Sequence, residues 1–223
     1  DQEWSMTIDE FNESIAGMQM FLGGDFILSK DGFAVFDEAD NMFIAYDNFT
    51  FEPGKGYIFY FASQPMIESI EFNSQPDFLL PQAAKAKARN VETVEESVWK
   101  YDASQFADNM GIVAALNNVD IPENYSIGAF VNGECRGKGK IVKKNIALIS
   151  VAGKAGETVS FRLYNEITGE YSDVKETTSY ALMKGSLKAP FSLTADGNGT
   201  TDINGVADVN EEDIIAIYTI NGK

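Results

Sequence analysis

The sequence predicts a mainly β protein, in which a small α+β N-terminal module precedes an antiparallel, immunoglobulin-like β-sandwich. Two observations lead to this fold class. A single helix pattern over residues 5–20 is followed by short apolar runs that end in turn signals. From residue 99 to about residue 193, seven short strand-like runs then recur at a spacing of roughly ten residues, which is typical of a sandwich.

The helix pattern begins with residues that cap helices. Ser5 and Thr7 are both capping types, and Asp9 and Glu10 suit the positive end of the helix dipole in the first turn. The apolar positions recur at spacings that place them on one helix face: Phe11, Ile15 and Met18. Gly23-Gly24 ends the element. We therefore expect one amphipathic helix near the N-terminus.

The strands expected next belong to a small sheet under this helix. Residues 25–29 and 32–36 are apolar runs separated by Lys30-Asp31-Gly32, which indicates a hairpin. Residues 41–46 read as a further strand. Residues 57–62 (YIFYFA) are apolar on both faces, which predicts a central strand buried on two sides. The N-terminal module is expected to cover residues 1–73.

The sandwich is expected over residues 97–193, after a linker over residues 74–96. The linker contains Pro76 and Pro81, and a short helix over 82–89 is the alternative for part of it. The expected sandwich strands are Met110–Leu116, Tyr125–Val131, Glu134–Val142, Ile146–Ala152, Thr158–Tyr164, Tyr171–Val174 and Tyr180–Met183. Asn132-Gly133 predicts a type I′ turn. Residues 194–223 form an acidic tail with a strand-like run over 214–220.

The composition excludes several classes of function. The 223 residues include 17 Lys and Arg, 34 Asp and Glu, no His and one Cys, which gives a net charge of −17. A His-based catalytic triad, a His-ligated metal and an internal disulfide are therefore impossible. Nucleic-acid binding is disfavoured because phosphates need clustered cations. No apolar run is long enough for a transmembrane segment.

Three stretches resemble modules of large exported surface proteins of anaerobic Gram-negative bacteria. The first is Gly24-Asp25-Phe26-Ile27 with Glu52-Pro53-Gly54-Lys55-Gly56-Tyr57, although the Gly-Trp-Asn-Trp opening of such modules is missing. The second is Gly128-Ala129-Phe130-Val131 with Gly133-Glu134-Cys135-Arg136-Gly137, which resembles a β-sandwich module. The third, Ile217–Lys223, is similar to the start of type IX-like C-terminal sorting domains. The resemblance implies an extracytoplasmic location, a binding or adhesive role and no catalytic activity.

Cys135 allows two interpretations, and so does the pair formed by its neighbours Glu134 and Arg136. The adjacent Arg136 could lower the pKa of the Cys135 thiol and create a nucleophile, but a small strand residue that faces inward is the simpler interpretation. Glu134 and Arg136 lie two residues apart on one strand face. They could hold an acidic ligand group or, more simply, form an ion pair that stabilises the hairpin.

Two further patterns could bind a ligand. Residues 196–203 (DGNGTTDI) place oxygen ligands as in a calcium loop, but they lack its glycine and its final carboxylate, so a polar linker is the preferred interpretation and no metal is expected. The aromatic residues could form a flat platform for sugars, with the strand core as the preferred alternative. The candidate platform residues are Trp4, Trp99, Tyr57, Phe59, Tyr60 and Phe61.

These observations favour a non-enzymatic, exported or cell-surface binding protein that acts as an adhesin without cofactors. Its partner, a protein or a glycan, would contact the sandwich loops or an exposed sheet edge, and such an edge also predicts self-association. The alternative is a carbohydrate-binding module that uses exposed aromatics. A hydrolase that uses only carboxylates is a third hypothesis. No catalytic or ligand-binding residue is assigned from the sequence.

Overall fold

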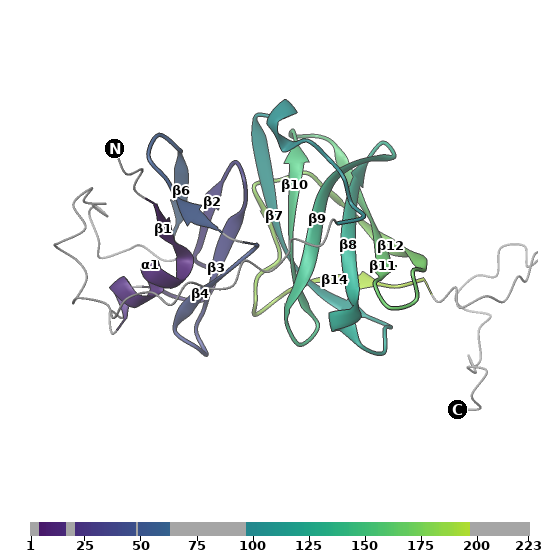
Figure 1. The fold of residues 1–223 in the computed structure, drawn as a ribbon, viewed down its shortest axis with the longest axis horizontal. Helices are drawn as coiled ribbons and strands as arrows, with labels where there is room; N and C mark the ends of the chain where they lie inside the picture. Colours follow the sequence, from purple (N-terminus) through teal and green to yellow (C-terminus); the bar gives the residue numbers. More distant parts are fainter. Residues whose placement is uncertain (1–4, 17–20, 48, 63–96, 197–223) are drawn as a thin grey trace, which may run out of the picture.

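The computed structural model describes residues 5–16, 21–47, 49–62 and 97–196. Within these residues the protein is mainly β, with one α-helix and antiparallel sheets, which confirms the predicted fold class. Figure 1 shows two groups of strands side by side, one formed by the N-terminal residues and one by residues after 97. The expected linker, the strand-like run over 214–220, Trp4 and Met18 lie outside the described residues.

The N-terminal part combines one helix with six short strands. These are β1 (Met6–Thr7), α1 (Ile8–Ile15), β2 (Phe26–Ser29), β3 (Phe33–Asp37), β4 (Met42–Ala45), β5 (Thr50–Phe51) and β6 (Tyr57–Tyr60). Four strands form an antiparallel sheet in the order β4-β3-β2-β6, and β1 pairs separately with β5. The predicted hairpin of residues 25–36 is therefore present as β2 and β3.

Helix α1 begins at a capping box. The Thr7 hydroxyl accepts a hydrogen bond from the Glu10 N–H at 3.2 Å, and the Glu10 carboxylate accepts one from the Thr7 N–H at 2.8 Å. Thr7 is thus the cap, whereas Ser5 precedes β1. The helix ends at Ile15, earlier than its pattern suggested, and buries Phe11 and Ile15 as predicted.

Residues after 97 form a curled sheet around a single core. Its elements are η1 (Ala103–Gln105), β7 (Asp108–Asn117), η2 (Pro122–Asn124), β8 (Tyr125–Val131), β9 (Glu134–Lys143), β10 (Ile146–Gly153), β11 (Thr158–Asn165), β12 (Tyr171–Ser179), β13 (Met183–Lys184) and β14 (Phe191–Thr194). The sheet order is β12-β11-β8-β9-β10-β7, and both β13 and β14 pair with β7 in parallel.

The two ends of this sheet meet. A bridge joins Val174 of β12 to Ala195 beyond β14, and the Asp196 N–H donates to the Asp173 carbonyl at 2.8 Å. The sheet therefore closes into a sandwich-like barrel, which we call the barrel (Figure 1). Its interior is filled by alternate side chains of the strands, including Ile112, Ile127 and Ile149.

Most of the expected sandwich strands are present, with two differences. β12 continues five residues beyond the predicted end at Val174. The predicted strand Tyr180–Met183 is wrong over its first residues, because Tyr180 turns into the barrel core and β13 begins at Met183. β14 was not predicted. Asn132 and Gly133 both have positive φ, at 50° and 81°, as a type I′ turn requires.

The prediction that residues 57–62 form a central strand buried on two sides is wrong. β6 is the end strand of the described sheet, and the side chains of Ile58 and Tyr60 are 52% and 46% exposed. Tyr57 and Phe59 pack on the helix side of the sheet, as expected from the two-residue period. Ile58 and Tyr60 point the opposite way, where the barrel covers the sheet only in part.

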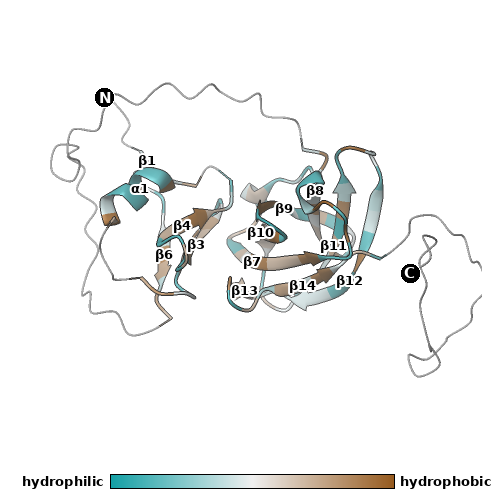
Figure 2. Cartoon of the chain, turned by 90° about the horizontal axis from the view of Figure 1, so that it is seen from below, coloured by the Kyte–Doolittle hydropathy of each residue, from teal (hydrophilic) through white to brown (hydrophobic). Residues whose placement is uncertain are grey.

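The barrel packs against the side of the N-terminal sheet that faces away from α1. Phe33, Val113 and Leu148 are fully buried in this contact. Gly111 of β7 allows it, because a Cβ there would lie 3.0 Å from the Phe33 ring. In Figure 2, α1 presents hydrophilic residues, whereas β3, β4 and β7 carry hydrophobic ones. The N-terminal sheet is therefore a middle layer between α1 and the barrel.

Ion pairs lie around this apolar contact, and in all of them the negative charge is on the same side of the interface. Every acid of these pairs lies in the N-terminal part and every lysine lies in the barrel. The pairs are Asp37 and Asp40 with Lys143, Glu38 with Lys188, and Asp47 with Lys138 and Lys140. Lys143 lies 2.8 Å from Asp37 and 2.6 Å from Asp40, and Lys188 lies 2.7 Å from Glu38. The two surfaces are therefore complementary in charge.

Candidate binding surfaces

A groove lies where β6 approaches the segment between β12 and β14. It consists of two neighbouring cavities of about 430 and 560 Å³, which both contact Ala181 and Leu182. Phe26 and Tyr60 line the first cavity, and Leu28 and Ile58 line the second. We call the two cavities together the β6 groove.

The walls of the β6 groove are mainly apolar and partly aromatic. Tyr60 stacks on Phe26, with ring centroids 4.7 Å apart and an interplanar angle of 14°. The exposed side chains of Ile58 and Tyr60 face Leu182, which is 46% exposed. Binding sites are common at such contacts between two parts of a chain, so this groove is one candidate surface.

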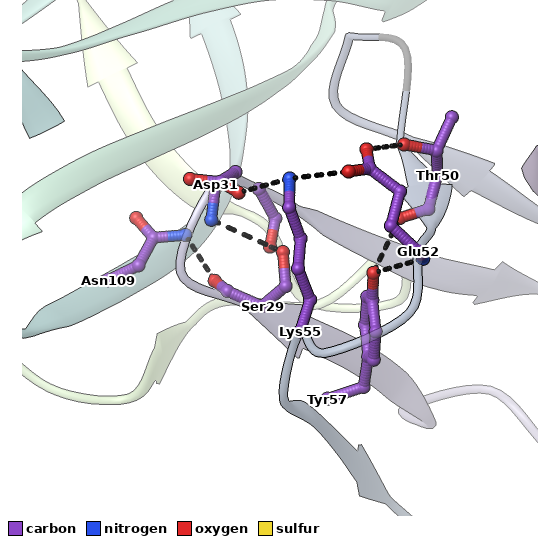
Figure 3. Close-up of polar contacts among 8 residues, drawn as sticks. Ser29, Asp31, Thr50, Glu52, Lys55, Tyr57 and Asn109 are labelled. Atoms are coloured by element: carbon purple, nitrogen blue, oxygen red, sulfur yellow. Dashed lines mark hydrogen bonds and ion pairs between the residues drawn. The ribbon is translucent and has the colours of Figure 1, made fainter. Parts of the chain in front are cut away.

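One end of the β6 groove is held by a polar network (Figure 3). The Asn109 side chain donates to the Ser29 carbonyl at 3.1 Å and accepts from the Ser150 hydroxyl at 2.8 Å. Lys55 bridges Asp31 and Glu52, at 2.8 and 3.2 Å. The network therefore joins the β2–β3 turn both to the segment before β6 and to the barrel.

A second candidate surface lies at one end of the barrel, on the β7–β8 loop (residues 118–124) and the β11–β12 turn (residues 166–170). Ile121 and Ile167 are 54% and 74% exposed on these two segments, and Tyr171, which follows the turn, is 48% exposed. The Glu166 N–H donates to the Asn124 carbonyl at 2.8 Å. This bond places the two segments next to each other, and we call them together the loop end.

Local hydrogen bonds order the backbone of the loop end. The Asn165 side-chain oxygen accepts from the Ile167 and Thr168 N–H groups at 2.9 and 3.0 Å, which is an Asx turn. Gly169 completes the turn with φ 75°. In the other segment the Ile121 carbonyl accepts from the Asn124 N–H at 3.1 Å. The exposed isoleucines are thus held by ordered backbone.

The aromatic platform, which was the less favoured interpretation, is not assembled among the described residues. Trp99 is buried on the outer face of the barrel over Gly128, and its indole N–H donates to the Ser126 hydroxyl at 3.0 Å. The rings around Trp99 stand edge-on to it, with Tyr171 at 75°. The candidates in β6 divide between the two faces of the sheet, and Phe61 packs on the helix side. Exposed aromatics therefore occur singly.

Glu134 and Arg136 form the ion pair that the simpler interpretation predicted. Arg136 Nε lies 2.9 Å from Glu134, and Arg136 Nη1 lies 2.8 Å from Glu157. The guanidinium also stacks over Phe106, 4.5 Å from the ring centroid. Arg136 thus contacts the hairpin, the β10–β11 loop and Phe106, so its guanidinium is already engaged within the chain.

Cys135 lacks the lowered pKa that an activated thiol requires. Burial raises the pKa of Cys135 and outweighs a backbone hydrogen bond with Gly137 that lowers it, and the Glu134 charge raises the pKa further. The thiol is therefore mainly protonated at neutral pH. Half-buried within β9, Cys135 behaves as the small strand residue of the alternative interpretation.

The calcium-loop pattern falls almost entirely outside the described residues. Its first residue, Asp196, lies 3.5 Å from Lys175. In the part of the chain that the structure describes, no three His, Cys, Asp or Glu side chains converge as a metal site. The helix in that part is also too short and polar to span a bilayer.

Comparisons with known proteins return no match: no family model, no curated protein and no solved structure is similar to this chain. The candidate surfaces therefore rest on geometry. Sequence reasoning named the sandwich loops in general, but it identified neither the residues of the loop end nor the β6 groove. For the loop end a signal existed, because Ile121 and Ile167 are single apolar residues within turn segments, where solubility favours polar ones. The β6 groove had no such signal.

Proposed function

We propose that this chain is a non-enzymatic, exported or cell-surface binding protein, an adhesin that contacts its partner through the loop end. The observation that carries the proposal is the pair of exposed isoleucines, Ile121 and Ile167, on two hydrogen-bonded loops of a closed barrel. Because the backbone of both loops is already ordered by hydrogen bonds, binding there requires less ordering of the chain. The extracytoplasmic location rests on the resemblance to exported surface modules.

The charged residues around the two isoleucines indicate which kind of partner surface would be complementary. Residues 118–124 and 166–170 contain no Lys or Arg and four acids: Asp120, Glu123, Glu166 and Glu170. All four are exposed. A partner surface with an apolar centre and a basic rim is complementary to this arrangement, and its association would be faster at low ionic strength.

A second candidate function is carbohydrate binding by Tyr171. This ring is exposed, and the Arg162 guanidinium carbon lies 5.3 Å from its centroid. Arg162 also pairs with Asp173 at 2.8 Å, so an aromatic ring and a polar pair stand side by side. Sugars are bound by such combinations of a stacking face and hydrogen-bonding groups.

The experiment measures binding of the labelled full-length chain to intact bacterial and epithelial cells and to a glycan array. The double substitution Ile121→Ser/Ile167→Ser is expected to reduce cell binding at least tenfold. The matched control, Ile58→Ser/Leu182→Ser, removes two exposed apolar side chains outside the loop end and should leave cell binding unchanged. Cell binding that survives the loop substitutions would contradict the proposal.

The glycan array separates the two candidates. Binding to an array glycan that is lost in Tyr171→Ser would favour the carbohydrate function over the adhesin. An exposed sheet edge also predicts self-association, which is tested separately. It is measured by light scattering at high protein concentration, where a strictly monomeric species would contradict it.

A further inference from the structure

We propose that the β6 groove binds an uncharged, elongated, apolar small molecule. Eight large apolar side chains are exposed in the described part of the chain, and three of them, Ile58, Tyr60 and Leu182, line this groove. Its floor, formed by Phe26 and Leu28, continues the apolar contact between the N-terminal sheet and the barrel. A ligand there would extend an existing apolar interface.

The wall opposite β6 is formed before any ligand binds. The Leu182 carbonyl accepts from the Gly111 N–H at 3.1 Å, and Met183 pairs in parallel with Gly111 of β7. Gly185 has φ 72°, and a Cβ there would lie 2.3 Å from the Val113 carbonyl oxygen. The chain is therefore held closely against the barrel. Preorganised walls reduce the free-energy cost of ordering on binding.

The buried polar groups that line the groove already have partners. Among the described residues, Asp25 is the only side chain with a formal charge that contacts the first cavity, and its two carboxylate oxygens accept from the Leu22 and Ala62 N–H groups at 2.8 and 2.7 Å. The buried Asn109 amide at the other end is likewise engaged. Lys30 and Asp108, which also contact the second cavity, are opposite in charge and both exposed to solvent. A charged ligand would lose its hydration without gaining a buried partner, so the complementary ligand is uncharged.

The shape of the groove indicates an elongated ligand. Asp25 contacts the first cavity and Lys30 contacts the second, so the groove follows β2 over this span. Five residue steps of an extended strand cover about 17 Å. The two cavities, about 430 and 560 Å³, meet at Leu182. A hydrocarbon chain or a linear aromatic molecule fits such a path better than a compact ligand.

The experiment titrates the full-length chain with N-phenyl-1-naphthylamine, an uncharged dye that fluoresces in apolar surroundings. We expect saturable fluorescence with one site per chain. Displacement should follow the chemistry of the groove: 1-decanol competes, decanoate competes at least tenfold more weakly, and maltose does not compete. No saturable binding, or equal competition by decanoate or by maltose, would overturn the proposal.

Substitutions place the dye in the groove. Ile58→Glu and Leu182→Glu each introduce a charge on one wall and should weaken dye binding at least tenfold. Ile167→Glu introduces the same charge at a still more exposed isoleucine of the loop end and should leave it unchanged. If either glutamate substitution lowers the thermal unfolding midpoint, the double substitution Ile58→Ser/Leu182→Ser is used instead. It is expected to weaken dye binding to the same extent. Equal weakening by Ile167→Glu would overturn the assignment. Because this readout does not involve the loop end, its failure is distinguishable from failure of the adhesin proposal.

Discussion

The two faces of the N-terminal sheet are covered in different ways. On one face, α1 packs through aromatic residues of the N-terminal part itself, such as Phe11 on Phe51 and Phe43 at 5.1 and 5.9 Å. On the other face, the barrel supplies Val113 and Leu148, about eighty or more residues away from the strands they cover. The helix face is sealed by aromatics, whereas the barrel face is bordered by ion pairs and leaves the β6 groove open.

This difference shows how one sheet can serve both stability and binding. The helix face can form without the barrel, because all of its contacts lie within the N-terminal part. The barrel face requires docking of a second unit. Docked surfaces that are complementary in charge at their rim and apolar at their centre resemble interfaces between proteins. The groove is then the part of this interface that the barrel does not fill.

The largest effect is expected from truncating one phenylalanine on each face. Phe33→Ala, on the barrel face, and Phe43→Ala, on the helix face, each leave a cavity and should each cost about 3–5 kcal/mol of stability. Both side chains are almost fully buried, at 0% and 2% exposure. We expect Phe33→Ala to separate barrel unfolding from N-terminal unfolding, so that calorimetry shows two transitions.

Phe43→Ala should instead lower the stability of the N-terminal part while the barrel transition stays at its position. The comparison between the two faces would fail if Phe33→Ala unfolded in one transition at the same cost as Phe43→Ala. Circular dichroism in the aromatic region provides a second readout, because the N-terminal part contains most of the packed phenylalanines.

A smaller effect is expected at the edge strand β4, which α1 protects. The buried Asn12 side chain donates to the Phe43 carbonyl at 2.8 Å and accepts from the Phe43 N–H at 2.7 Å. Asn12→Ala leaves both backbone groups without these partners and should cost about 2 kcal/mol in urea unfolding. Hydrogen exchange at the Phe43 amide should accelerate accordingly.

The matched control for Asn12 is Glu13→Ala, one position along the same helix. Glu13 is exposed, so its loss should change stability by less than about 0.5 kcal/mol. If Asn12→Ala were as mild as this control, the amide would not be the group that protects β4.

The smallest effect concerns the ion pairs at the barrel face. Burial raises the pKa of Asp37, but hydrogen bonds from Lys143 and from the Ala39 N–H outweigh burial and hold this pKa below its ordinary value of 3.8. Because the folded-state pKa is lowered, the stabilisation is present above pH 3.8 and is lost as pH falls below it. Docking of the N-terminal part should therefore weaken as the pH falls from 3.8 toward this lowered pKa.

Lys143→Met should remove most of this acid sensitivity and make docking less dependent on salt. Lys55→Met is the matched control, because Lys55 pairs with Asp31 and Glu52 inside the N-terminal part. Both are measured as the pH dependence of the calorimetric transitions between pH 3 and 7. An unchanged pH profile in Lys143→Met would show that the barrel-face ion pairs do not couple the two parts.

Local patterns predicted most of the elements but misplaced β6. The capping residues identified α1, and Asn132-Gly133 identified the β8–β9 turn, because backbone preferences act within a few residues. Residues 57–62 were assigned to the sheet centre because both their faces are apolar. The second apolar face instead lines the β6 groove, and a sequence pattern does not distinguish a buried face from a binding face.

The sequence by itself determined the fold class, the capping of α1, most of the barrel strands and the ion pair of Glu134 with Arg136. These features depend on periodicity and on neighbours within a few residues. Only the tertiary structure decided that Tyr180 enters the barrel core, that β14 returns to β12, and that Phe33 meets Gly111. It also placed Ile58 opposite Leu182. Such contacts join residues far apart in the chain, and many pairings of apolar surfaces have similar local propensity, so three-dimensional packing alone selects among them.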